Sequence, residues 1–268
     1  MGKISSEAKK RYFDKVKEYK QGTETILQRE KNLLKVIEND DAGGNYKRMK
    51  LADERLNLAS QYLLLNRISL ALLGVKNEAF LNDARKSCYQ AVIYLEEVVT
   101  NLIDAPFSDY SERLETIDGV GDDERYELIR KMGFTIQSVE EDFGENSKWR
   151  WSFVELEGRF TTVAKNLINM KTLVSGMDPR VDGYKSRMAH LELVKFLLNK
   201  SADRYRQKYE LSTSRIDDFK QAISYLSALR RLHQILGEAA EVEQVKRKFD
   251  VWKTKMEDDE KRSDTKKS

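Results

Sequence analysis

Residues 77–102 read NEAFLNDARKSCYQAVIYLEEVVTNL, and the spacing of their apolar side chains decides the fold class. From Phe80 to Leu102 apolar residues recur after three or four positions, which places them on one face of an α-helix. We expect this helix to begin at Asn77. Cys88 lies on the apolar face and is the only cysteine. We therefore expect it to pack as a small buried side chain.

Apolar residues are also spaced three or four positions apart before residue 77. We expect helices over residues 5–38 and 46–73, separated by the Asn-, Asp- and Gly-rich turn 39–44. Residues 62–73 are apolar nearly all round, which predicts that they form the most enclosed segment. Long helices joined by short turns predict an antiparallel bundle over residues 1–104.

The pattern changes at Asp104-Ala105-Pro106. Pro106 has no N–H and disfavours helical backbone at Ala105, so we expect a hinge there. Residues 105–147 are predicted to form an acidic junction. Its short helices are expected over residues 108–117, 122–132 and 135–143, separated by glycines.

Residues 148–256 are predicted to form a C-terminal helical arm, with Pro179 as a second hinge. Ser214 and Asp217 have the spacing of a capping-box variant at one helix start. The helices are expected over residues 148–174, 181–211 and 215–236, and from Gly237 to Met256. Residues 257–268 contain no apolar side chain and are predicted to be a disordered tail.

The predicted fold is therefore all-α and elongated, with long antiparallel helices in two arms joined at a bend near Pro106. Composition agrees, since only 2 of 268 residues are proline and 35% are charged. No stretch approaches the about 20 apolar residues of a membrane span, so no span is expected.

Charge is distributed unevenly although the net charge is only +3. Residues 104–147 hold thirteen acidic and four basic side chains, and residues 148–255 hold 22 basic and 13 acidic ones. This polarity suits contacts within the fold or self-association between copies.

Side chains that perform catalysis are scarce. The two histidines, His190 and His233, have no Cys, second His or carboxylate at a ligand spacing, and we expect them at the surface or partly buried. The sequence therefore predicts no catalytic residues, no metal site, no cofactor and no enzymatic activity.

Residues 114–134 resemble a helix-hairpin-helix, in which Gly119-Val120-Gly121 occupies the hairpin whose amides bind a nucleic-acid phosphate. Asp122, Asp123 and Glu124 depart from that family, because they would face the phosphate with three negative charges. The sequence therefore disfavours nucleic acid, and these three residues become candidates for binding a protein partner. The alternative is a tight turn with acidic residues at a helix start.

Lys148-Trp149-Arg150-Trp151 is the most unusual segment. Trp149 continues an apolar stripe and is predicted to lie in the core. Trp151 lies about 200° further around the helix, either on a second buried face or exposed. If it is exposed, Trp151 with Lys148 and Arg150 is a candidate partner-binding anchor.

The helical layout, the break at Asp104-Ala105-Pro106 and the aromatic segment Trp149–Phe153 resemble the flagellar coiling proteins of the spirochaete flagellar sheath. Those proteins are all-helical, bent between two arms and exported to the periplasm. The resemblance implies a non-enzymatic periplasmic sheath subunit that contacts the flagellin core and other sheath proteins and is needed for filament shape and motility. The given sequence starts without a signal peptide, which leaves a cytoplasmic location as the alternative.

Two other functions remain open. A nucleic-acid-binding module would use the hairpin at Gly119–Gly121 and the basic helices after Lys185. A helical adaptor scaffold is suggested by the last helix pair around Gly237, although no sustained 34-residue repeat supports it.

Overall fold

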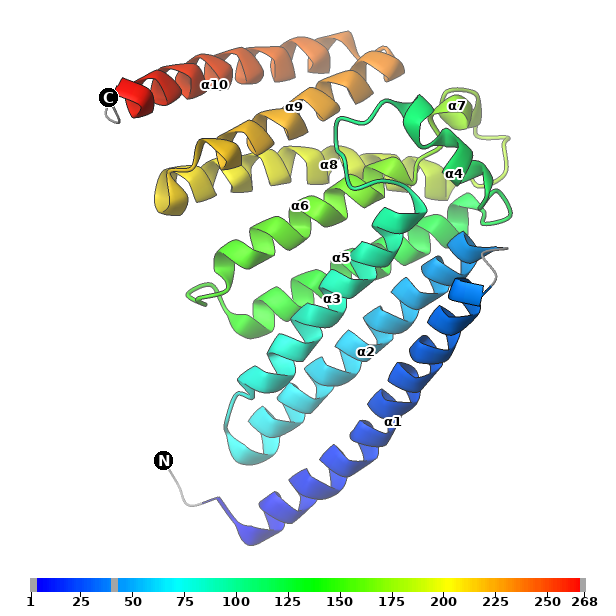
Figure 1. Cartoon of the computed structure of the whole chain (residues 1–268), viewed down its shortest axis with the longest axis vertical. Helices are drawn as coiled ribbons and strands as arrows, with labels where there is room; N and C mark the ends of the chain where they lie inside the picture. The colour runs from blue at the N-terminus through cyan, green and yellow to red at the C-terminus, as the bar shows by residue number, and fades with distance from the viewer. Residues whose placement is uncertain (1–3, 40–42, 266–268) are drawn as a thin grey trace. The chain divides into compact units, whose positions relative to one another are not determined.

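The computed structural model describes residues 4–39 and 43–265. It is 84% helical, without a strand in the described part, so the predicted all-α class is confirmed. Figure 1 shows the helices in chain order. Their bounds are α1 Ser6–Asn39, α2 Gly44–Leu73, α3 Glu78–Val98, α4 Ser111–Glu115, α5 Asp122–Phe143, α6 Arg150–Asn166, α7 Met170–Leu173, α8 Tyr184–Lys208, α9 Ile216–Leu236 and α10 Ala239–Thr265.

The chain forms two compact units whose segments alternate along the sequence. Unit 1 contains the described residues up to Val99 together with 113–119 and 127–156. Unit 2 contains residues 100–112 and 120–126 and the described residues from Glu157 onward. Segments of the interval 105–147 thus belong to both units, and the backbone passes from one unit to the other inside α5 and inside α6.

Unit 1 is organised around α2, which packs against both α1 and α3. Helix α3 begins at the predicted place, and Asn77 caps it, because Asn77 Oδ1 accepts hydrogen bonds from the amides of Ala79 and Phe80. Gly74 ends α2 with φ 65°, a left-handed conformation that glycine adopts without steric cost. Of the predicted turn 39–44, residues 40–42 lie outside the described residues.

Burial along α2 differs from the prediction. Leu51 and Leu56 in its first half are fully enclosed, whereas Leu64 and Leu70 in the predicted enclosed segment 62–73 are 39% and 53% exposed. The reason lies in α1, where no residue before Thr23 is buried. Because the helices are antiparallel, only the second half of α1 covers α2, and the end of α2 extends beyond that cover (Figure 1).

A buried carboxylate connects the first three helices. Glu30, which interrupts the apolar stripe of α1, is only 6% exposed. It accepts hydrogen bonds from Arg55 of α2 at 2.6 Å and from the Tyr94 hydroxyl of α3 at 2.5 Å. Burial and the Glu30 carboxylate raise the pKa of Tyr94, so its hydroxyl remains protonated and donates. Cys88 of α3 is fully buried, as predicted.

Two predicted helix boundaries are wrong around α5 and α6. α5 continues through Gly133, because burial of Met132 and Ile136 on either side offsets the about 1 kcal/mol that a helical glycine costs. α6 ends at Asn166 instead of continuing to residue 174. Asn169 then caps the separate helix α7 by accepting a hydrogen bond from the Lys171 amide.

The later helices also differ from prediction. The expected capping box is absent, because Ser214 adopts φ 50° and Thr213 forms the local hydrogen bonds instead, to Asp218 and from the Arg215 amide. α10 continues past Met256 to Thr265. Polar contacts offset the lack of apolar residues after Met256, since Asp259 binds Lys255 and the Tyr209 hydroxyl. The predicted disordered tail is therefore helical through Thr265, and residues 266–268 lie outside the described part.

Candidate functional site

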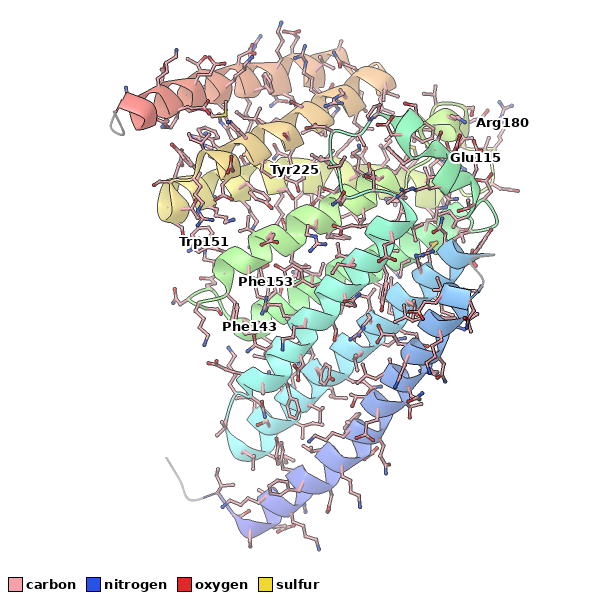
Figure 2. The ribbon with its side chains drawn as sticks, in the orientation of Figure 1. Glu115, Phe143, Trp151, Phe153, Arg180 and Tyr225 are labelled. Atoms are coloured by element: carbon pink, nitrogen blue, oxygen red, sulfur yellow. The ribbon has the colours of Figure 1, made fainter. Side chains whose placement is uncertain are left out.

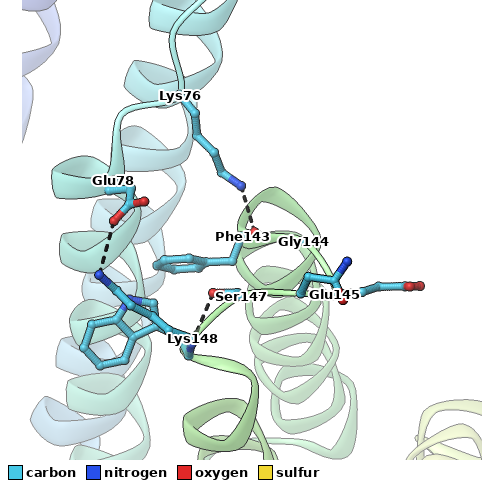
Figure 3. Close-up of a pocket in the computed structure, with 9 residues that line it drawn as sticks. Lys76, Glu78, Phe143, Gly144, Glu145, Ser147 and Lys148 are labelled. Carbon is cyan, nitrogen blue, oxygen red and sulfur yellow. Dashed lines mark hydrogen bonds and ion pairs between the residues drawn. The ribbon is translucent and has the colours of Figure 1, made fainter.

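A hollow within unit 1 lies where the loop between α5 and α6 meets the start of α3 (Figure 3). Its volume is about 430 Å³. It is lined by Lys76, Glu78 and residues 143–149. The hollow therefore adjoins the segment Lys148–Trp151 that the sequence singles out.

Short-range hydrogen bonds fix the loop that forms this hollow. Gly144 has φ 82° and its amide donates to the carbonyls of Glu140 and Glu141, which ends α5. Lys76 donates to the Phe143 carbonyl at 2.7 Å, as the dashed line in Figure 3 shows. Phe143 packs edge-on against Phe153 with 5.5 Å between ring centroids. The loop is thus held at both ends by unit 1.

Trp149 is half-buried instead of enclosed in the core as predicted. The Arg85 guanidinium of α3 lies 4.0 Å from its ring centroid, and Arg85 also donates to the Ser152 hydroxyl at 2.8 Å. The indole Nε1 of Trp149 is buried and has no hydrogen-bond partner in the described structure. Arg85 therefore fixes the ring, while the indole N–H of Trp149 is left without an acceptor inside the described protein.

Lys148, Arg150 and Trp151 lie together at the start of α6. Trp151 is half-buried, and the Arg150 guanidinium stacks 4.8 Å from its ring centroid. The Lys148 side chain is 71% exposed and lies 3.6 Å from Glu78. Figure 2 shows Trp151 near the labelled pair of Phe143 and Phe153. The three predicted residues thus form one positively charged aromatic segment, which we call the α6 anchor.

The acidic candidates Asp122, Asp123 and Glu124 belong to unit 2 and form no part of this hollow. Asp122 pairs with Arg187, whose guanidinium also donates to the Gly176 carbonyl at 2.5 Å. Asp123 and Glu124 are exposed. Asp122 therefore has a structural partner, and the exposed pair remains for solvent or a protein.

The amides of the helix-hairpin-helix-like turn are engaged within the protein. The Gly119 amide donates to the Tyr46 hydroxyl at 2.9 Å. The Gly121 amide donates to the Glu124 carboxylate at 3.3 Å. A phosphate would have to displace both acceptors, one of them negatively charged.

Both predicted hinge residues lie outside the long helices. Pro106 precedes the 3₁₀ turn Phe107–Asp109, and Pro179 lies between the turn Ser175–Met177 and α8.

Sequence reasoning missed the α3 residues that support the α6 anchor. Arg85 stacks on Trp149, and Tyr89 donates its hydroxyl to the Ser152 carbonyl at 2.7 Å. The four-residue spacing of Arg85 and Tyr89 places them on one face of α3, and that is the signal that could have identified a shared contact.

The two histidines are buried, contrary to the prediction. His190 is 5% exposed and its Nε2 lies 2.9 Å from the Ala164 carbonyl. Burial lowers the pKa of His190 to about 4. His233 is 7% exposed and its Nδ1 lies 2.5 Å from Glu238. Within residues 4–39 and 43–265, no group of three His, Cys, Asp or Glu is placed to hold a metal ion.

A comparison with known families matches residues 8–260 to the TP0443 family, whose name derives from the spirochaete Treponema. The chain belongs to the TP0443 family. No curated protein and no solved structure matches it. In this TP0443-family chain, none of the described helices has both the length and the apolar character needed to cross a bilayer.

Proposed function

We propose that this protein is a non-enzymatic structural component that binds other proteins through the α6 anchor of Lys148, Arg150 and Trp151. The observation that carries the proposal is the half-buried Trp151 with Arg150 stacked on it, next to exposed Lys148. Trp and Arg are enriched among the few residues that contribute most of the binding free energy at protein interfaces.

The adjoining hollow supports the same surface. It offers a partner a concave region of about 430 Å³ beside the anchor, with Trp149 in its lining. Lys148 and Arg150 favour a partner surface with acidic or carbonyl groups.

In its specific form, the proposal is a subunit of the periplasmic flagellar filament sheath that contacts the flagellin core and other sheath proteins and supports filament shape and motility. Two arguments support it: the resemblance to flagellar coiling proteins and the spirochaetal origin of the family name. The exposed Asp123 and Glu124 of unit 2 provide an opposite charge for self-association between copies in such a sheath.

The test is co-sedimentation of the purified protein with isolated spirochaetal periplasmic flagellar filaments. We expect the wild-type protein to pellet with filaments and Trp151→Ala to bind at least about tenfold more weakly, as expected for loss of a hot-spot Trp. Phe13→Ala is the matched control, because Phe13 is 65% exposed in unit 1 and lies outside the anchor. It should pellet like the wild type.

Two results separate the general proposal from its specific form. If the wild type fails to pellet, the sheath assignment is wrong. Crosslinking mass spectrometry in cells, with a photoreactive residue at exposed Glu155, then tests partner binding itself. Equal crosslinking yields for wild type and Trp151→Ala would contradict the anchor as well.

The structure weakens the nucleic-acid alternative. The hairpin amides have protein acceptors, and basic residues of α8 are paired with carboxylates, including Lys200 and Arg204 with Glu157. Salt-dependent DNA binding would revive this alternative.

A further inference from the structure

A second hollow lies wholly within unit 2, and a buried lysine lines it. Its volume is about 120 Å³. Most of its wall is apolar and comes from the segment around Pro106 and from α9. The wall includes Phe107, Tyr110, Met170, Leu232 and Ile235.

Lys165 of α6 is only 8% exposed, so its ammonium group is largely removed from water. It donates one hydrogen bond to the Ile103 carbonyl at 3.0 Å and lies 5.9 Å from the ring centroid of Tyr110. An ammonium group carries three donors, and burying a charge is costly unless partners compensate it. The described contacts of Lys165 therefore leave capacity for a further acceptor.

The charges around the hollow do not balance. Arg231 also lines it and pairs with Asp104 at 2.9 Å, so two cations face one carboxylate. Burial, with a contribution from Arg231, lowers the pKa of Lys165 to about 8, and Asp104 opposes part of this change. Burial also raises the pKa of Tyr110 to about 12, so that hydroxyl stays neutral. Near neutral pH the site thus carries an excess positive charge that an anion would compensate.

Size restricts what this anion can be. A cavity of about 150 Å³ holds benzene, so a hollow of 120 Å³ suits roughly six non-hydrogen atoms. The lining suits a ligand whose hydrogen-bond acceptor contacts Lys165 and whose short apolar chain lies along the apolar wall.

We propose that this hollow binds a short-chain aliphatic monocarboxylate, with the carboxylate on Lys165 and the chain against Phe107 and Ile235. The site lies apart from the α6 anchor in sequence and in unit, so it goes beyond the partner-binding function.

The test uses isothermal titration calorimetry of the full chain near pH 6, where Lys165 is protonated. Sodium butyrate is the probe, and n-butanol and n-butylammonium are the neutral and cationic analogues of the same chain length. Butyrate should bind at least about tenfold more tightly than either analogue, because only it compensates the buried charge.

Three variants test the geometry. Lys165→Met keeps an unbranched apolar stem and should lose at least about tenfold in butyrate affinity. Ile235→Trp should block the opening, because Ile235 is 47% exposed at the rim; Val251→Trp, at a 68% exposed position on α10 outside the hollow, is its control and should bind butyrate normally.

Asp104→Asn is expected to increase butyrate affinity, a change that misfolding of the variant would not produce. Removing this carboxylate increases the excess positive charge, so butyrate should bind roughly threefold more tightly or better. The proposal is overturned if butyrate binds no better than butanol, if Lys165→Met binds it like the wild type, or if Asp104→Asn weakens it in a variant with an unchanged circular dichroism spectrum.

Discussion

Gly158 of α6 lies directly against the ring of Tyr205 of α8: a Cβ added at this glycine would be 2.6 Å from the Tyr205 Cε2 atom. The hydroxyl of Tyr225 in α9 would be equally close. The two tyrosine rings stack with centroids 5.6 Å apart, and both are buried. The absence of a side chain at position 158 thus allows three helices of unit 2 to meet.

Gly158→Ala should therefore destabilise the protein by about 1–3 kcal/mol, because rigid buried rings must shift. Urea unfolding followed by circular dichroism measures this change in free energy of unfolding. Gly121→Ala is the control: an added Cβ meets no atom within 4 Å and φ is not positive, so a neutral or slightly stabilising effect is expected. Equal stability of the two variants would contradict the packing argument.

Glu30→Gln should weaken the attachment of α1. The substitution removes the charge that accepts from Arg55 and Tyr94, and a buried hydrogen bond to a charged group is worth about 1.5–3 kcal/mol. Hydrogen exchange should show that the substitution accelerates exchange of the α1 amides, relative to wild type, more than it accelerates exchange of the α3 amides. Glu7→Gln removes an exposed pair with Arg11 and should change stability by less than about 0.5 kcal/mol.

Because His190 is buried, we expect the protein to lose stability in mild acid. Its pKa falls from 6.5 to about 4 on folding, chiefly through burial, so the unfolded chain binds the proton more tightly. The associated stability is complete above pH 6.5 and decreases as pH falls toward 4, by up to about 3 kcal/mol.

Urea unfolding of wild type and His190→Gln at several pH values measures this effect. Glutamine can still donate to the Ala164 carbonyl but does not titrate, so the difference in stability between the two proteins should change across this window. A pH-independent difference would show that the pKa of His190 is the same in the folded and the unfolded protein, and would contradict the prediction.

We expect the Cys88 thiol to react with an alkylating reagent only when unit 1 unfolds. Burial raises its thiol pKa to about 12, and the side chain is fully enclosed. Alkylation by iodoacetamide should therefore be negligible in the folded protein and should increase with urea in parallel with unfolding. Rapid labelling without denaturant would contradict the buried position.

The sequence predicts local helical structure well, because cap residues and apolar spacing act over a few neighbours. Helix α3 begins directly after Asn77, and α2 ends at Leu73, the last residue of the predicted helix 46–73. The burial of Glu30 and the exposure of Leu70 were not predictable in this way, since both depend on which part of α1 covers α2. Likewise, an apolar stripe could place Trp149 on a face of α6 but could not show Arg85 stacked upon it.

Because segments of the two units alternate along the chain, no single cut of the backbone separates one unit from the other. The backbone passes between units after Val99, Glu112, Gly119, Tyr126 and Leu156. A cut in the loop after Phe143 would therefore leave two fragments that each carry pieces of both units, and no single truncation isolates either one. A fragment that keeps all of unit 1 must extend to Leu156, and one that keeps all of unit 2 must begin no later than Thr100, so the two fragments would share residues 100–156.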